Sequence, residues 1–144
     1  MKKILFFVLI TITPFYLHAK APIADKSEFE RQILECFQKE DVRKCLPPFM
    51  KRNYMRDVTD EDVNQITNTF TTWLRNDHVY AIHKAKTTKI AEFYDERIYV
   101  IEDTSGSAMV MILGFRNRNG AWYLSRIGLN SQENEVGKIL GLTP

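Results

Sequence analysis

The order of two sequence periodicities constrains the fold of this chain more than any other feature. Up to about residue 76, apolar residues recur at the three- and four-residue spacing of amphipathic helices, whereas β-branched and aromatic residues dominate from His78 onward. Helices in one block and strands in the next indicate an α+β domain with an antiparallel sheet. The sequence therefore predicts a single α+β domain over residues 20–144.

The first predicted helix runs from about Ser27 to Lys39. Ser27 and Glu30 have the spacing of a capping box, in which the hydroxyl accepts from a free backbone N–H and the glutamate reaches back to the cap residue. An apolar stripe follows at helical spacing, formed by Phe29, Ile33, Cys36 and Phe37.

Two more helices are predicted before the strands. The second is short, begins at Asp41 and ends or changes direction at Pro47-Pro48, because proline lacks an N–H and restricts the residue before it. A further turn or two is expected after the prolines, with Phe49, Met50 and Tyr54. The third begins at Thr59, which forms an approximate capping box with Asp62, and ends near Asn76-Asp77. Its apolar face consists of Val63, Ile66, Phe70, Trp73 and Leu74.

Four strand-like runs cover residues 78–94, 97–106, 108–115 and 121–129. The third run is apolar on both faces, which predicts a central strand. Asn119-Gly120 predicts a tight hairpin between the last two strands, since both residues tolerate positive φ. In the last strand, Trp122 and Leu124 should share one face. The tail after residue 129 has two readings, a short docked helix weakened by Gly137 or a frayed end.

Residues 1–19 have the order of parts of a secretory signal peptide, with Lys2-Lys3, an apolar run over Ile4–Ile12 and a small residue at Ala19. The rival reading, a membrane anchor, needs about 20 apolar residues, more than this run supplies. Cleavage after Ala19 is favoured over cleavage after Ala21, because the second choice would place Pro22 immediately after the cleaved bond. We expect an exported protein, periplasmic or secreted, with no membrane span after signal removal.

The charge balance bears on the class of partner. The sequence has a formal net charge of +2, and loss of Lys2 and Lys3 with the signal peptide brings it to about zero. Short basic groups such as Lys51-Arg52 alternate with polar or apolar residues, as on a solvated surface. Such a chain lacks the basic footprint that nucleic-acid backbones demand, so we expect no nucleic-acid partner.

Two stretches carry a resemblance to a known family. FERQILECFQKEDVRKCLPPFM is similar to the opening helix pair of the NTF2-like family, and NGAWYLSRIGL is similar to its closing hairpin. The resemblance implies an NTF2-like cone, a curved four-stranded antiparallel sheet wrapped over the N-terminal helices, often with a pocket inside. It implies no single activity, because this fold hosts isomerases, dehydratases, secretion-system parts and interaction modules.

NTF2-like enzymes use a carboxylate or histidine inside the cone, beside a tyrosine or a second acid. His78 and His83 have a spacing that puts them on opposite faces of an ideal strand, so they do not converge. His83 is either a base inside the cone or a surface histidine, and we favour the surface. Asp77, Glu92 and Asp95 are interpreted as solvated carboxylates. The candidate pocket residues are therefore His83, Trp73 and Trp122, with no catalytic assignment.

Metal and cofactor sites lack a sequence basis. The two cysteines lie in the helical block, and the two histidines that follow the signal peptide lie in the first strand, which disfavours a zinc site. The sequence has no P-loop, dinucleotide fingerprint or G-x-S-x-G motif. We expect no metal and no cofactor. The plentiful aromatic residues are expected in the core, with a ligand-lined cone as the alternative.

Cys36 and Cys45 are predicted to form a disulfide. An exported chain passes through an oxidising space, and the spacing puts one thiol late in the first helix and the other early in the second. A redox-active pair would more usually be C-x-x-C at a helix start. We therefore expect a structural bridge.

These features favour a non-catalytic protein-interaction module, either an accessory to a secretion or envelope system or an immunity-type inhibitor. Its expected partner is another envelope or secreted protein. The alternative is binding of a small apolar ligand, or an isomerase- or dehydratase-type enzyme that uses the cone pocket.

Overall fold

The computed structural model describes residues 20–142 and consists of three helices, four strands and a last helix. The elements are α1 (Lys26–Gln38), α2 (Val42–Asn53), α3 (Asp60–Leu74), β1 (Val79–Ile90), β2 (Tyr94–Asp103), β3 (Ala108–Arg118), β4 (Ala121–Asn130) and α4 (Glu133–Leu140). The predicted signal peptide lies outside the described residues. Over residues 20–142, no helix has the length and apolar character needed to cross a membrane.

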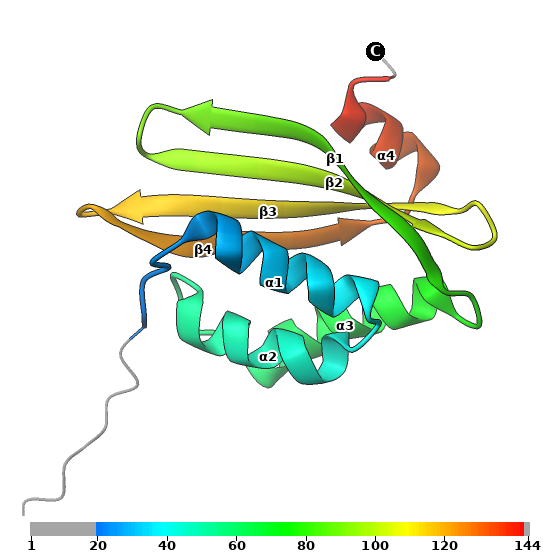
Figure 1. The fold of residues 1–144 in the computed structure, drawn as a ribbon, viewed down its shortest axis with the longest axis horizontal. Coiled ribbons are helices and arrows are strands. Elements are labelled where there is room, and N and C mark those ends of the chain that lie inside the picture. The colour runs from blue at the N-terminus through cyan, green and yellow to red at the C-terminus, as the bar shows by residue number, and fades with distance from the viewer. Residues whose placement is uncertain (1–19, 143–144) are drawn as a thin grey trace, which may run out of the picture.

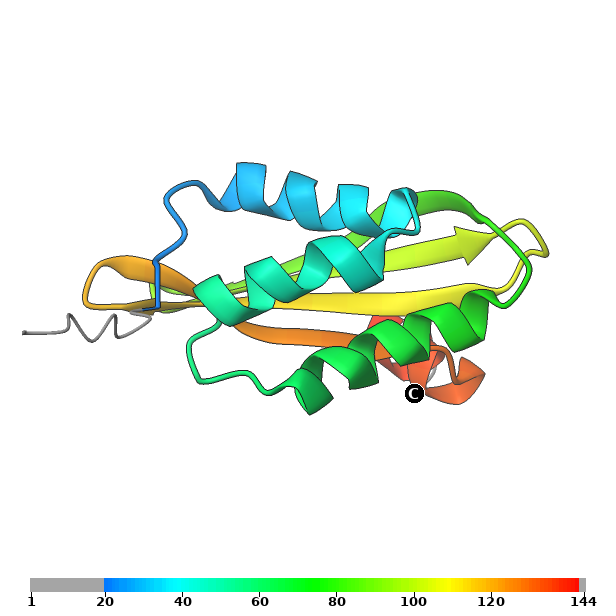
Figure 2. The same cartoon turned by 90° about the horizontal axis from the view of Figure 1, so that it is seen from below.

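The four strands form one open antiparallel sheet in the order β1-β2-β3-β4. Helices α1, α2 and α3 cover one face, here called the inner face, and α4 lies against the other, the outer face (Figures 1 and 2). This confirms the predicted α+β class with a four-stranded antiparallel sheet. The Asn119-Gly120 hairpin is also confirmed, since both residues have positive φ, 54° and 82°.

The core lies between the inner face and the three helices. Alternate residues of β3 contribute Met109, Met111, Leu113 and Phe115, all fully buried. From the helices, Phe37 and Phe70 meet edge to face with ring centroids 5.0 Å apart. On the outer face, a smaller cluster of Ile98, Val110 and Ile112 packs against Val136, Ile139 and Leu140. β3 is thus buried on both faces, as predicted, and the tail forms a docked helix.

The predicted capping box of α1 is wrong. Asp25 is the N-cap, and its carboxylate accepts hydrogen bonds from the backbone N–H groups of Ser27 and Glu28, at 2.8 and 3.1 Å. An aspartate is as good a cap as serine, and its place two residues earlier lets the helix begin at Lys26. Glu30 is thereby free of any capping role and turns into the domain interior.

The second helix does not end at its two prolines, because α2 continues through Pro47 and Pro48 to Asn53, and the further turn expected after them belongs to the same helix. Each ring removes a helical hydrogen bond, at a cost of roughly 3 kcal/mol in a helix interior. Burial of Leu46 on one side of the prolines and of Met50 on the other offsets that cost, since both side chains reach the core only if the helix continues.

The capping box of α3 is confirmed, with Thr59 Oγ1 accepting from the Asp62 N–H at 3.1 Å and the Asp62 carboxylate accepting from the Thr59 N–H at 2.8 Å. The helix ends at Leu74, slightly earlier than predicted. Arg75 follows in a positive-φ conformation, φ 51°, which turns the chain toward β1.

Candidate functional site

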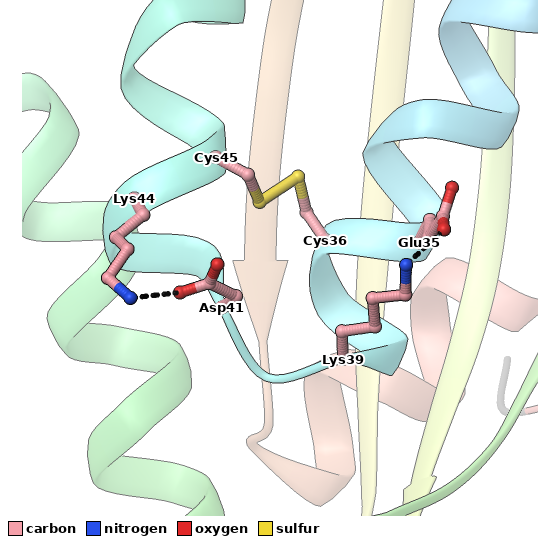
Figure 3. Close-up of a disulfide and its surroundings, with 6 residues drawn as sticks. All are labelled: Glu35, Cys36, Lys39, Asp41, Lys44 and Cys45. Carbon is pink, nitrogen blue, oxygen red and sulfur yellow. Dashed lines mark hydrogen bonds and ion pairs between the residues drawn. A yellow bond between two sulfur atoms is a disulfide. The ribbon is translucent and has the colours of Figure 1, made fainter.

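A disulfide joins α1 to α2, as predicted. Cys36 and Cys45 are bonded across the turn between the helices, with their Cα atoms 5.9 Å apart (Figure 3). Cys36 is buried in the main core cluster and Cys45 packs at its margin. The bridge therefore connects two helices that also share hydrophobic contacts, and the described residues hold no free cysteine.

The three predicted pocket residues lie in three different places. Trp73 is half-buried beside Phe70 on α3, and Trp122 lies beneath the Lys26 ammonium, 3.5 Å from its ring centroid. His83 points away from both, on the outer face of the sheet, where Nε2 lies 3.5 Å from Glu102. Its side chain is 61% exposed, so the surface interpretation of His83 is confirmed and the three residues form no common pocket.

The two histidines also bind different partners. His78 lies just before β1, and its Nδ1 is 3.2 Å from the Glu40 carboxylate, which also accepts a hydrogen bond from the Val79 N–H at 2.9 Å. Glu40 thus holds the start of β1 against the α1–α2 turn. Over residues 20–142, no cluster of three or more metal-ligating side chains occurs.

A buried polar cluster, which sequence reasoning missed, lies between α1 and β2. Glu30 accepts hydrogen bonds from the Arg97 guanidinium and the Tyr99 hydroxyl and forms an ion pair with Lys84 at 2.6 Å. Arg97 also bonds the Asp95 carboxylate at 3.1 Å. Only 8% of Glu30, 8% of Arg97 and 1% of Tyr99 is exposed. We call Glu30, Asp95, Arg97 and Tyr99 the buried ion cluster.

Asp95 is therefore not the solvated carboxylate that the sequence suggested. Its side chain is almost fully buried, and its second partner is the Lys26 ammonium at 2.9 Å. The alternation of Asp95, Arg97 and Tyr99 at two-residue spacing was the available signal, because such residues share one face of a strand. Glu30 is the one charged residue on the otherwise apolar face of α1, and its charge is opposite to that of Arg97. This was the second part of the signal.

The buried ion cluster has a carboxylate beside a tyrosine, as NTF2-like enzymes do, but the arrangement does not suit catalysis. Burial raises the pKa of Tyr99 far above its usual range, so its hydroxyl stays protonated. Arg97 and Lys84 neutralise Glu30. A general base must reach a substrate proton, and side chains this enclosed offer a substrate no access.

A wide polar hollow of about 820 Å³ lies beside Trp73. Its walls are the C-terminal half of α3, the β2–β3 turn and the residue after β4. We call it the α3 cleft. It is lined by Gln65, Asn68, Thr69, Thr72, Trp73, Arg75, Asp77, Asp103, Ser105, Ser107 and Ser131.

Hydrogen bonds hold the turn that forms one wall of the α3 cleft. Asp103 Oδ1 accepts from the Ser105 N–H, the Ser105 hydroxyl and the Ser107 N–H, at 2.9, 2.7 and 2.8 Å. Burial is the largest single influence and raises the pKa of Asp103, but the hydrogen bonds from Ser105 and Ser107 together outweigh it and leave the pKa below its usual value. Asp103 is therefore charged at neutral pH and fixes the turn.

The two edges of the sheet differ. Along β4, the Ile23 N–H donates to the Trp122 carbonyl and the Met55 N–H to the Leu124 carbonyl, both at 2.7 Å. In the part of the chain that the structure describes, β1 has a backbone ladder only with β2. Most of its second half is exposed, and it carries Lys86 and Lys89. We call the outward side of β1 from Tyr80 to Ile90 the β1 edge.

Comparisons with known proteins give no family for the chain. No family model matches it, and no curated protein matches it. One solved structure that it resembles is that of a DUF4783 family protein from Bacteroides ovatus ATCC 8483, with 12% identity, a TM-score of 0.46, and coverage of 71% of this chain and 94% of that one. A likeness of that size carries no functional argument, so function must be inferred from the residues described above.

Proposed function

We propose that this protein is an exported, non-catalytic interaction module of NTF2-like type that binds another envelope or secreted protein through the β1 edge. The order of three helices followed by an antiparallel four-stranded sheet supports the NTF2-like assignment. The signal-peptide pattern and the Cys36–Cys45 bridge support export, since disulfides persist in oxidising compartments.

Within residues 20–142 the outward side of β1 pairs with no further strand, and this free edge is the observation that carries the proposal. An edge strand presents backbone N–H and C=O groups in a row, to which an extended segment of another chain adds as a further strand. Lys86 and Lys89 give this edge a positive charge, because both are exposed and neither forms an ion pair within residues 20–142. The same lysines repel a second copy of the chain, so the partner segment that fits is extended and acidic.

The alternative, a cone-pocket enzyme, is not favoured by any contact among residues 20–142. Its best candidate, Glu30 beside Tyr99, is enclosed and neutralised in the buried ion cluster. A small apolar ligand fares no better in the α3 cleft, where Trp73 is the one apolar lining residue.

Site-specific photocrosslinking in the native envelope tests the proposal. A photoreactive residue at Thr87 should give one discrete adduct, whereas the same residue at Lys44, exposed on α2, should give none. Lys86→Glu with Lys89→Glu should abolish the Thr87 adduct, and Lys44→Glu should leave it intact. Equal adducts from Thr87 and Lys44, or an adduct that survives both charge reversals, would contradict binding through the β1 edge.

Export has a separate test. N-terminal sequencing of protein recovered from the envelope or medium should begin at Lys20. Retention of Met1 would overturn the compartment argument and with it the choice of an envelope partner.

A further inference from the structure

The α3 cleft shares no lining residue with the β1 edge and is lined almost entirely by polar side chains. Ten of its eleven lining residues are polar, and the single apolar residue is Trp73. Its volume of about 820 Å³ is within the range of small-molecule sites. The cleft is open to solvent, which suits a ligand lying across it better than a compact ligand enclosed within it.

The charges of the cleft argue against an ionic ligand. Arg75 supplies one positive charge, whereas Asp77 and Asp103 supply two negative ones. A phosphate or an acidic glycan would face both carboxylates, and a cation would face the guanidinium. An apolar ligand would bury the many amides and hydroxyls without replacing their hydrogen bonds to water, which costs about 1–3 kcal/mol for each group. A neutral ligand rich in hydroxyl groups avoids all three penalties.

We propose that the α3 cleft binds a neutral oligosaccharide. Sugar hydroxyls both donate and accept, and so they match amides, carboxylates and a guanidinium at once. The face of a pyranose ring that carries only C–H bonds packs on an aromatic ring, and Trp73 is the one aromatic residue of the lining. The proposal does not depend on the β1 edge or on its partner.

Several groups of the cleft are held in place before any ligand arrives. Asn68 Oδ1 accepts a hydrogen bond from Arg43 at 3.0 Å, and the Asp77 carboxylate accepts one from the Thr104 hydroxyl at 3.3 Å. Packing against Phe70, with ring centroids 6.1 Å apart, orients the indole of Trp73. Such preorganisation lowers the entropic cost of binding.

Other groups are free to bind. Within residues 20–142, the side chains of Gln65, Thr72, Arg75 and Ser131 make no hydrogen bond or ion pair. These four come from α3, from its C-terminal end and from the start of the β4–α4 connection, and they line the α3 cleft together with Trp73. The cleft therefore combines an indole held by Phe70 with hydrated donors and acceptors that are available to a ligand.

The two tryptophans of the chain provide a direct test. Trp122→Phe leaves Trp73 as the sole indole reporter, and Trp73→Phe leaves Trp122. Each protein, purified after export with its disulfide intact, is titrated with cellotriose, maltotriose and chitotriose, with a heparin tetrasaccharide as the anionic comparison. At least one neutral trisaccharide should change the fluorescence of the Trp122→Phe protein in a saturable way and leave that of the Trp73→Phe protein unchanged.

Calorimetric titration of further variants locates the site. Trp73→Ala should weaken trisaccharide binding at least tenfold. Because Trp73 also packs on Phe70, Gln65→Ala and Ser131→Ala serve as surface variants that leave the core intact, and each should weaken binding at least threefold. Lys44→Ala, outside the cleft, should not change the affinity.

Three outcomes overturn the proposal. The first is the absence of heat and fluorescence change with all three neutral trisaccharides up to about 10 mM, a concentration that detects even millimolar affinity. The second is binding of the heparin fragment alone. The third is neutral-sugar binding that Gln65→Ala, Ser131→Ala and Trp73→Ala all leave unchanged. None of these outcomes bears on the crosslinking result for the β1 edge, so the two proposals fail separately.

Discussion

Replacement of Glu30 by leucine should destabilise the domain by about 3–5 kcal/mol. Glu30 is the shared acceptor of the buried ion cluster, since Arg97, Tyr99 and Lys84 all direct a donor at its carboxylate. Leucine has a similar volume and no acceptor. The substitution therefore removes the carboxylate while leaving its three donors where they are.

The expected loss of stability follows from the donors that Glu30→Leu leaves without their acceptor. The Tyr99 hydroxyl, in a residue 1% exposed, loses its acceptor, and an unsatisfied buried group costs about 1–3 kcal/mol. Arg97 keeps Asp95 as a partner but loses Glu30, and breaking a buried ion pair by removing one side typically costs about 3–5 kcal/mol. Because Asp95 retains part of the compensation, we expect a total loss of about 3–5 kcal/mol rather than the sum of both terms.

Urea unfolding followed by circular dichroism measures this loss. The matched control is Glu28→Leu, two positions away on the same helix. Glu28 forms an ion pair with Arg31, and both side chains of that pair are exposed. That pair should matter much less, as exposed pairs do. The double variant Glu30→Leu with Arg97→Met should recover part of the loss, because it removes both charges of the pair and leaves Asp95 its second partner, Lys26. A loss below about 1 kcal/mol for Glu30→Leu, or no recovery in the double variant, would refute the reasoning that the cluster is a coupled buried unit.

Three further predictions concern the bridge, a turn and a close contact. Removal of the disulfide with Cys36→Ser and Cys45→Ser should lower the free energy of unfolding by about 2–3 kcal/mol. The intact mass of the unmodified protein, measured without reductant, should be two hydrogens lower than that of the reduced chain, and two free thiols would contradict the bridge. Because the folded pKa of Asp103 lies below its unfolded value, its contribution is present above about pH 4 and is lost as the pH falls. Asp103→Asn should therefore flatten the fall in melting temperature between about pH 6 and pH 2, and identical slopes for variant and native protein would show that the turn does not depend on this charge. Gly114→Ala should cost about 1–3 kcal/mol, because a Cβ there would lie 2.8 Å from the Tyr94 hydroxyl and 3.0 Å from Arg126 Cβ. Adding Tyr94→Phe should restore only part of that loss, and full stability of Gly114→Ala alone would mean that the strands shift freely.

Local signals in the sequence were sufficient for much of the fold. The box at Thr59 and Asp62, the Asn119-Gly120 turn and the Cys36–Cys45 bridge each depend on residues within ten positions of one another. For such close residues, the spacing in the sequence largely fixes how the cap, the turn or the bridge forms. The class of the fold followed in the same way, because long runs of helical and then of strand periodicity leave few alternatives.

The errors occurred where two interpretations competed for one residue. Glu30 has the right spacing from Ser27 for a capping box. In the structure Asp25 caps the helix instead, and the Glu30 side chain points toward β2. Pro47 and Pro48 should stop an isolated helix, yet burial of Leu46 and Met50 outweighed the lost hydrogen bonds. In both cases tertiary packing decided, and the local sequence does not contain it.

The candidate sites were harder to predict than the fold for a related reason. The α3 cleft combines Gln65 and Trp73 with Ser105 and Ser131, which are separated by up to 66 positions in the chain. Among these residues, Trp73 alone stood out in the sequence, where the core was the expected place for an aromatic residue and a pocket was the alternative. Its companions are ordinary surface amides and hydroxyls until the sheet brings the β2–β3 turn and the end of β4 against α3. A search for catalytic motifs passes over such residues, because binding a neutral, hydroxyl-rich ligand requires no perturbed base, nucleophile or metal, only many modest hydrogen bonds around one aromatic face.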